Sequence, residues 1–453
     1  AHWIAPTTLE LLGLALDRIA DARVLVLITA RPDDQPALLG HPHLTRLSLN
    51  RLSRGPTEAI IAHLTDGRFV PPEMLAQIAA RTDGVPLFVE ELTKAVFADS
   101  RAAVPLTLQD SLMARLDRVS RAREVAQVAS CIGREFNYTL LATISPVPEL
   151  ELRSALDQLT AAELVFRRGQ VPEATYIFKH ALVQEAAYQS LLKSRRKQLH
   201  AKIIRALKDN IPEQIETNLD VAAHHCTQAG LFASAVDYRC QAGMRALSRF
   251  AMAEATAQLN EGLALIKNEP DGIERDRREL EMQLALSRAL LFTKGAGAKE
   301  TGSACMRAHQ LAERQNDIRQ LYAAIAGEFS FYFMRAEHNT ALEAANTLLS
   351  TARQHQSDDA LCIGHLRFGE ASFMLGAFAD ARASLKRSLE VGEQLESCSA
   401  LSALLPHNPR THGLNYLAWA LFALGYLDQA MALCSQAIAE ARMLSDPFVL
   451  ADA

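Results

Sequence analysis

Apolar residues recur at every third or fourth position over most of this chain, which is the spacing of one face of an α-helix. From about residue 213 to residue 453 the pattern continues with little interruption and predicts helix after helix. Between residues 53 and 102 the same spacing predicts three short helices: Thr57–Leu64, Pro72–Arg81 and Leu87–Phe97. We therefore expect a mainly α-helical protein.

Two apolar runs near the start of the chain have a different pattern. Residues 24–30 (VLVLITA) are continuously apolar, as expected of a strand in a buried parallel sheet. Residues 44–49 predict a second strand, and a helix is expected to precede both, from Thr7 or Thr8 to about Ala20. Residues 1–52 therefore predict part of an α/β core.

A third pattern occupies residues 103–210, where helices precede a small hairpin. Tyr138–Ile144 and Glu149–Leu159 predict helices. Leu164–Arg168 and Thr175–Phe178 predict short strands on either side of a turn that contains glycine and proline. Three helices followed by a hairpin is a pattern typical of winged-helix domains.

The helical region after residue 213 repeats loosely. Its frame is a small residue, glycine seven positions later, alanine five later and a small residue seven later, with the glycines at Gly230, Gly376 and Gly425. The frame resembles that of tetratricopeptide (TPR) repeats, in which small residues let two helices approach closely. The interval from Gly376 to Gly425 exceeds the 34 residues of that repeat, so we expect longer or additional helices.

The stretch Asp83–Leu92 (DGVPLFVEEL) joins two of the predicted helices. Gly84 can take the positive φ that ends the first helix, and Pro86 suits the first turn of the second. The turn alone indicates a helix stop followed by a helix start, and a binding role is the alternative.

The order of elements around this turn gives it a further interpretation. A strand ending at Arg31, a second strand, short helices and a Gly-x-Pro turn resemble the second half of the nucleotide-binding module in signal-transducing ATPases with numerous domains (STAND), a branch of the AAA-type ATPases. In that family the proline of the turn lies against the nucleotide base. The resemblance therefore implies nucleotide contacts at Arg31, Gly84 and Pro86, with ATP or ADP and Mg as cofactors of the parent protein.

A second resemblance concerns the segment Phe178–Tyr188 and the basic residues Arg195–His200 behind it. They resemble the ATPase region that follows class III adenylate or guanylate cyclase domains in bacteria. The implied domains are 1–52 as the C-terminal part of an AAA-type ATPase core, 53–102 as a helical lid with the Gly-x-Pro turn, 103–210 as a winged-helix-like domain and 211–453 as TPR-like helical repeats.

The signals for catalysis are weak. The sequence has no G-x-x-x-x-G-K-[ST] loop, so we interpret the chain as a fragment without the Walker A loop and cyclase domain and expect no ATPase or cyclase turnover from it alone. No catalytic residue and no metal site is predicted. His41 and His43 lack a third ligand nearby, and neighbouring residues such as His224–Cys226 or Glu90–Glu91 point in different directions on a helix.

Composition and charge indicate the cellular compartment of the protein and argue against a membrane span and against DNA as a partner. The chain is 49% hydrophobic and 22% charged, its net charge is −5, and its seven cysteines form no C-x-x-C pair. This favours a reduced, cytoplasmic protein, and no apolar run reaches the roughly 18 residues of a membrane span. The predicted helix Glu149–Leu159 is mostly acidic, so DNA is an improbable partner.

Three functions remain open. The first is a regulatory segment of a bacterial cyclase-linked signalling ATPase, which senses nucleotide and contacts a protein partner through its TPR-like repeats. The second is an ATPase-type transcriptional regulator with a TPR-like sensor domain. The third is a helical-repeat scaffold.

Overall fold

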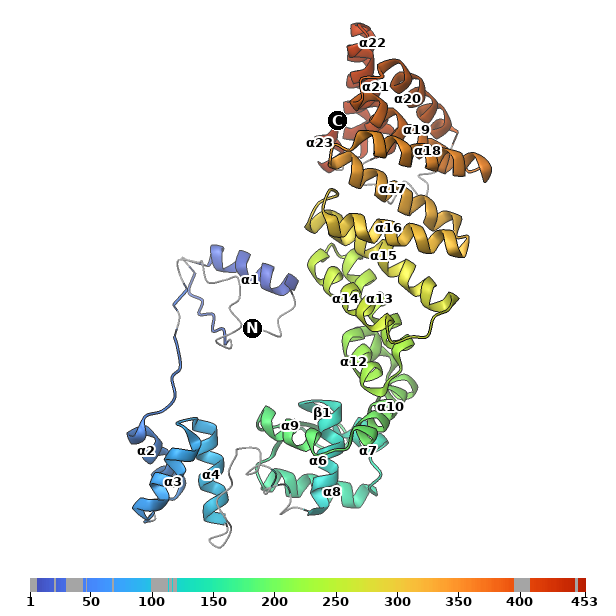
Figure 1. Ribbon diagram of the computed structural model, residues 1–453. Helices are drawn as coiled ribbons and strands as arrows, with labels where there is room; N and C mark the ends of the chain where they lie inside the picture. Colours follow the sequence, from blue (N-terminus) through green and yellow to red (C-terminus); the bar gives the residue numbers. More distant parts are fainter. Residues whose placement is uncertain are drawn as a thin grey trace. The chain divides into compact units, whose positions relative to one another are not determined.

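The computed structural model describes residues 6–19, 22–29, 44–45, 47–66, 69–98, 113, 116, 120–394, 408–444 and 447–453. These residues are mainly helical (Figure 1). The chain divides into two compact units: unit 1 holds Ala1–His2 and Ala15–Leu231, and unit 2 holds Trp3–Leu14 and Phe232–Ala453. Helix α1 (Pro6–Arg18) belongs to both ranges.

The described residues of unit 1 after α1 form the following helices and strands. Their bounds are α2 (Arg54–Leu64), α3 (Pro72–Thr82), α4 (Pro86–Ala98), α6 (Ser120–Ile132), β1 (Glu135–Asn137), α7 (Tyr138–Ile144), α8 (Glu149–Ala161), β2 (Val165–Arg168), β3 (Thr175–Phe178), α9 (Ala181–Gln189), α10 (Lys193–Asn210), α11 (Pro212–Thr217) and α12 (Leu219–Ala229). Most of the helices predicted from residue 53 to residue 161 are confirmed to within a few residues.

Helices α2, α3 and α4 pack around one small core. Ile61, Ile78 and Leu92, one from each helix, are fully buried in it. Burying an aliphatic side chain of this size contributes about 1.5–3 kcal/mol. The three short helices are therefore held together by side chains that the helical spacing had placed on their inner faces.

The predicted hairpin is confirmed and is part of a three-stranded antiparallel sheet. Strand β3 is central, with β1 and β2 on either side. Phe136 pairs with Tyr176 across β1 and β3, and Val165 pairs with Phe178 across β2 and β3. These side chains face the core, because all four are buried.

The prediction of two strands before residue 50 is wrong for those of their residues that the structure describes. Residues 24–29, 44–45 and 47–50 form neither helix nor strand. Leu25 and Leu27 are more than 80% exposed, and Leu49 is 98% exposed. A continuous apolar run becomes a buried strand only when neighbouring strands satisfy its backbone groups and cover both faces. No such strand pairs with these residues within the described part of the chain.

Unit 2 is an array of antiparallel helices in which each packs on the next. Their bounds are α13 (Phe232–Ser248), α14 (Met252–Ile266), α15 (Ile273–Thr293), α16 (Lys299–Gln315), α17 (Ile318–Met334), α18 (His338–Gln354), α19 (Asp358–Met374), α20 (Phe378–Glu393), α21 (Pro409–Ala423), α22 (Leu427–Leu444) and α23 (Pro447–Asp452). The prediction of a helical repeat is confirmed for this unit. The first predicted copy spans the division: α12 packs on α10 in unit 1, and α13 packs on α14 in unit 2.

The turns of this array share one geometry. Asn316, Ala336, Gln356 and Gly376 all have positive φ and lie twenty residues apart, each after a helix. At Ala336 the N–H bonds to Phe333 O at 3.0 Å and the next N–H bonds to Tyr332 O, which is the double hydrogen bond of a Schellman turn. The repeat of this segment is therefore one helix every twenty residues, and glycine marks only some of its turns.

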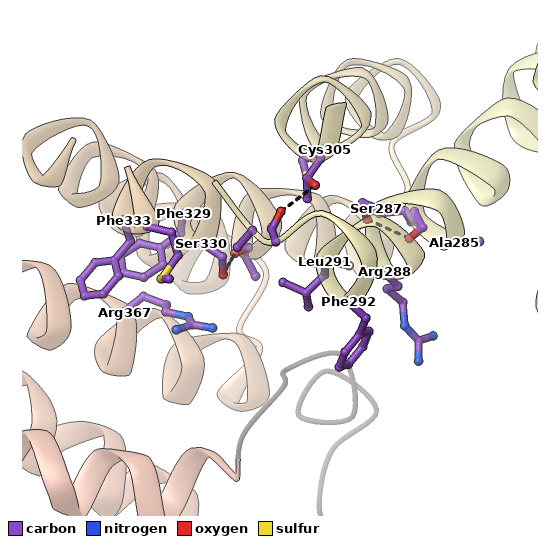
Figure 2. Close-up of a pocket in the computed structure, with 18 of the residues that line it drawn as sticks. Ala285, Ser287, Arg288, Leu291, Phe292, Cys305, Phe329, Ser330, Phe333 and Arg367 are labelled. Atoms are coloured by element: carbon purple, nitrogen blue, oxygen red, sulfur yellow. Dashed lines mark hydrogen bonds between the residues drawn. The ribbon is translucent and has the colours of Figure 1, made fainter. Parts of the chain in front are cut away.

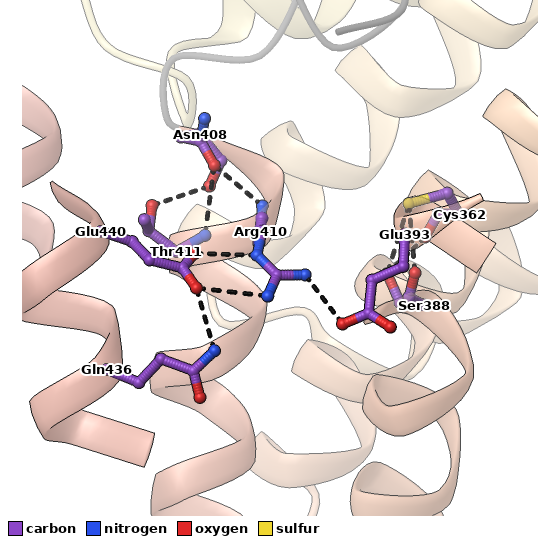
Figure 3. A network of polar contacts seen from close by, with 8 residues as sticks. All are labelled: Cys362, Ser388, Glu393, Asn408, Arg410, Thr411, Gln436 and Glu440. Atoms are coloured by element: carbon purple, nitrogen blue, oxygen red, sulfur yellow. Dashed lines mark hydrogen bonds and ion pairs between the residues drawn. The ribbon is translucent and has the colours of Figure 1, made fainter. Parts of the chain in front are cut away.

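The prediction of longer or additional helices between Gly376 and Gly425 is not tested, because most of the extra residues lie outside the described part of the chain. Helix α20 ends at Glu393 and α21 begins at Pro409, so the extra residues lie between these helices, mostly in 395–407, outside the described residues. Figure 3 shows how the start of α21 is held. Arg410 pairs with Glu440 of α22 and Glu393 of α20, and the Asn408 side chain caps the helix.

Candidate functional sites

The Gly84 turn has the backbone geometry that the sequence predicts. Gly84 has φ +65°, and α4 begins at Pro86. The N–H of Leu52 donates to the carbonyl oxygen of Gly84 at 2.7 Å. A Cβ at Gly84 would lie 2.2 Å from the carbonyl oxygen of Leu52. Glycine is therefore required here both by φ and by this close approach.

Pro86 is exposed and lines a pocket of about 600 Å³ in unit 1. The other lining residues come from α2, from the start of α4 and from the residue before α9: Ala59, Ile60, His63, Leu64, Leu87, Glu90 and His180. The structure thus places Pro86 in the lining of this pocket, whereas Gly84 is buried and is not one of the lining residues. Arg31, the third residue implied by the family resemblance, lies outside the described residues.

Four charged side chains form a network beside this pocket. Lys94 Nζ bonds to Glu90 Oε1 at 2.9 Å and to Glu163 Oε2 at 2.8 Å. Lys179 Nζ lies 3.1 Å from Glu163 Oε2 and 3.5 Å from Glu90 Oε1. Hydrogen bonds from Lys94 and Lys179 lower the pKa of Glu163 to about 2. The network connects α4 to the segments before β2 and α9.

Glu90, Glu91 and His180 also have ligand atoms within 4.8 Å of one another, the one such group found in the described part of the chain. The sequence did not indicate it, because Glu90 and Glu91 are adjacent and His180 is distant along the chain. Glu90 is already bonded to Lys94, which lowers its pKa. The group therefore has the character of an ion-pair network more than of a metal site.

Three histidines gather between α10 and α12. His200 Nδ1 and His225 Nδ1 are 2.8 Å apart, both residues are buried, and His224 stacks edge-on against each. Burial, reinforced by His224, lowers the pKa of His200 to about 4, and burial together with His200 lowers that of His225 to about 3. Both rings are therefore neutral at pH 7, and the cluster is part of the packing of α10 on α12.

Unit 2 holds a larger cavity, of about 950 Å³ (Figure 2). Its walls are mainly apolar and come from α13, α15, α16, α17, α19, α21 and α23. Leu291, Phe329 and Phe333 are among its apolar residues. Cys305 also lines it, and burial raises the pKa of this thiol to about 12, so the thiol is unreactive at neutral pH.

The polar end of this cavity is built around Arg367 and Glu370 of α19. Both are buried, at 3% and 1% exposure, and Arg367 Nη1 donates to Glu370 Oε2 at 2.8 Å. His412 Nε2 is 3.5 Å from Glu370 Oε1, and His412 Nδ1 is 2.8 Å from Asp452 Oδ2. Burial, with Glu370 as the next cause, raises the pKa of Tyr416 beside them. Polar side chains of three helices thus meet at one wall.

Arg367 and Glu370 were not predicted as site residues from the sequence. Arg367 and Glu370 flank Phe368 and Gly369, which the repeat frame had assigned to the packed side of a helix. Charged residues three positions apart usually lie on an exposed helix face. Helix α19 is buried on several sides, because α17, α18, α20 and α21 all pack on it. A charged pair inside a helix otherwise rich in small and aromatic residues was the signal available.

The part of the chain that the structure describes has no helix long and apolar enough to cross a bilayer. No family model matches the chain. An uncharacterized protein of Rhizobium meliloti (strain 1021) is 27% identical over 460 residues, which cover 97% of this chain and 44% of that protein. The chain therefore spans less than half the length of this curated relative.

Three solved structures are weakly similar to parts of this chain. A STAND protein with a tetratricopeptide repeat sensor from Pyrococcus horikoshii covers 91% of this chain and 63% of its own, at 13% identity and a TM-score of 0.33. A Rap protein complexed with competence and sporulation factor covers 76% of this chain and 79% of its own, at 11% identity and a TM-score of 0.38. The apo form of RapI covers 47% of this chain and 72% of its own, at 16% identity and a TM-score of 0.40. These TM-scores are too low to establish a shared fold. The helical array is therefore described from the contacts between this chain's own helices.

Proposed function

We propose that this chain is a regulatory segment of a signalling protein, in which the helical array of unit 2 binds a ligand or a protein partner. The observation that carries the proposal is the cavity of about 950 Å³ within the array. Ligand pockets of about 300–1,000 Å³ with apolar walls and a few convergent polar groups are typical of binding sites. This cavity has apolar walls and one polar end at Arg367 and Glu370.

The finer proposal is that unit 1 senses ATP or ADP with Mg in a longer parent protein linked to a cyclase. Its support is the exposed Pro86 at the rim of a pocket that also contains His63 and His180. The helices and hairpin of residues 120–178 would then be a winged-helix-like domain behind a helical lid. An ATPase-type transcriptional regulator and a plain scaffold are the competing functions, and a scaffold would need neither pocket.

The experiment fills the cavity with a large side chain and measures how much this weakens the binding of a fluorescent probe. Ser330 on α17 lines the cavity, and its hydroxyl donates to Ala326 O at 3.0 Å. Ser350 on α18 is exposed and outside the cavity, and its hydroxyl donates to Thr347 O at 2.9 Å. We expect the apolar fluorophore 8-anilinonaphthalene-1-sulfonate to bind the full chain, Ser330→Trp to abolish saturable binding, and Ser350→Trp to leave it unchanged.

Circular dichroism of both variants establishes that they are folded. If the fluorophore binds Ser330→Trp as tightly as the unchanged chain, the cavity does not receive ligands and the proposed function is wrong. The same holds if no saturable binding is found with the unchanged chain.

A further inference from the structure

Arginines in unit 2 use one edge of the guanidinium group to hold carboxylates. Nε and Nη2 of Arg307 donate to the two carboxylate oxygens of Glu279 at 2.6 and 2.9 Å. Nε and Nη2 of Arg410 donate to those of Glu440 at 2.8 and 3.2 Å. The two N–H groups on this edge are parallel, and their spacing matches the two oxygens of a carboxylate.

The same edge of Arg367 holds no carboxylate among the described residues. Its Nε and Nη2 atoms are buried and have no hydrogen-bond partner among the described residues, while Nη1 is bonded to Glu370. The guanidinium carbon lies 5.0 Å from the centre of the Phe329 ring, which stacks on Phe333. Packing against Phe329 and the bond to Glu370 therefore fix the orientation of this edge. Buried donors without an acceptor are unfavourable, so the edge favours an anion.

An acceptor lies beside these donors. Glu370 Oε1 is buried and makes no hydrogen bond among the described residues, and His412 Nε2 lies 3.5 Å from it. The site therefore offers two donors for a carboxylate. The oxygen of Glu370 that is not bonded to Arg367 is an acceptor for an N–H. Arg288 and Arg319, both exposed, line the same cavity and have no ion-pair partner in the described residues, which further favours an anionic ligand.

We propose that this cavity binds a short apolar peptide by its free C-terminal residue. The terminal carboxylate accepts hydrogen bonds from Nε and Nη2 of Arg367, the amide N–H of the same residue donates to Glu370 Oε1, and its side chain packs against Phe329 and Phe333. In a peptide these three groups belong to one residue, which matches their proximity here. A cavity of about 950 Å³ has room for more than one amino acid. The inference rests on the proposed function of unit 2.

The test uses the full chain and isothermal titration calorimetry. The probes are N-acetylated tripeptides of leucine and phenylalanine, each with a free C-terminal carboxylate or a C-terminal amide, and decanoate as an apolar acid without an N–H. The variant Arg367→Lys keeps the positive charge and loses the paired donors. Arg307→Lys is the matched control, because it also removes the paired Nε and Nη2 donors but at a position outside the cavity.

We expect the free-acid peptides to bind and the amidated peptides to bind at least about tenfold more weakly. Arg367→Lys should weaken free-acid binding by a similar factor, and Arg307→Lys should leave it unchanged. Equal binding of acid and amide, or unchanged affinity of Arg367→Lys, would overturn the proposal. Binding of decanoate alone would show that the ligand is a free acid and that the peptide inference is wrong.

The fluorophore experiment separates this inference from the function on which it rests. If Ser330→Trp abolishes fluorophore binding and no peptide binds, the cavity receives ligands of another class and only the peptide inference fails. If the fluorophore does not bind the unchanged chain, both fail.

Discussion

Gly84 and Leu52 are joined backbone to backbone: the Leu52 N–H donates to the Gly84 carbonyl oxygen at 2.7 Å, and no Cβ fits between the two segments. Gly84→Ala should therefore destabilise the packing of α2, α3 and α4. Positive φ and the contact with Leu52 together cost about 2–4 kcal/mol. Urea unfolding followed by circular dichroism measures the loss.

Gly55 provides the control for this substitution. It lies in the first turn of α2, and a Cβ there would meet no atom within 4 Å. Gly55→Ala should be neutral or stabilising by about 0.5–1 kcal/mol, because alanine is the better helix former. Equal effects of the two substitutions would contradict the requirement for glycine at Gly84.

Pro86→Ala tests the nucleotide proposal in the longer parent protein. Pro86 is exposed and begins α4, so the fold should remain intact. If its ring contacts the base, losing that contact should weaken ATP or ADP affinity about five- to thirtyfold, or about 1–2 kcal/mol. Val85→Ala, next to it but outside the pocket lining, should leave affinity unchanged.

Fluorescence titration with a labelled nucleotide, together with the melting temperature, decides between the two interpretations of this turn. Normal folding with unchanged affinity would mean that Pro86 only begins a helix.

The buried histidines predict loss of stability in mild acid. The pKa values of His200 and His225 in the folded chain are lowered to about 4 and about 3, from 6.5. Below pH 6.5 the unfolded chain therefore takes up protons that the folded chain does not, so stability falls as pH falls from about 6.5 towards 4. Each histidine accounts for about 2 kcal/mol between pH 7 and pH 5, so the free energy of unfolding of this region should fall by about 2–4 kcal/mol.

Pulse proteolysis at pH 7 and pH 5, with mass-spectrometric identification of the cut sites, locates the loss. Cleavage in α10 and α12 should increase at pH 5 and should depend less on pH in His225→Phe. His355→Gln, at an exposed position of unit 2, serves as the control. The prediction is wrong if cleavage of α10 is the same at both pH values.

The twenty-residue turns give a pair of opposite substitutions. Ala336 has φ +59° and Gly376 has φ +82° in the same kind of turn, and a Cβ at Gly376 would meet nothing within 4 Å. Ala336→Gly should stabilise unit 2 by about 0.5–1 kcal/mol, and Gly376→Ala should destabilise it by about 1 kcal/mol. Thermal unfolding that moves in the same direction for both would show that φ does not govern these turns.

These turns also explain what the sequence could and could not predict. Helix positions such as Pro72–Thr82 follow from local spacing, and Gly376 and Gly425 mark turns because glycine has little cost at positive φ. Asn316 is a residue type that tolerates positive φ, whereas Ala336 and Gln356 adopt it because packing of the neighbouring helices outweighs the local cost, so the last two turns carry no clear sequence signal. The repeat was therefore recognised, but its twenty-residue period was not.

The residues of the candidate sites also divide into those with a local sequence signal and those placed by packing. The turn at Gly84 and Pro86 could be predicted because a turn has a local signature, whereas the pocket residue His180 is brought there by the hairpin and α9. Arg367 was missed because its burial depends on four surrounding helices. The apolar run at residues 24–29 was misread for the converse reason: its composition suits a strand, but pairing partners decide whether a strand forms.

Helix α4 has one further consequence for its pocket. Pro86 and Glu90 stand four residues apart on one helix face, and Glu90 is bonded to Lys94 and faces Lys179. Ion pairs weaken as ionic strength rises, and partly buried pairs such as these are screened less than exposed ones. Pro86 and Glu90 both line the pocket, so a ligand that contacts Glu90 changes the strength of these ion pairs, and the two are thermodynamically coupled. Ligand affinity at this pocket should therefore vary with the concentration of dissolved salt.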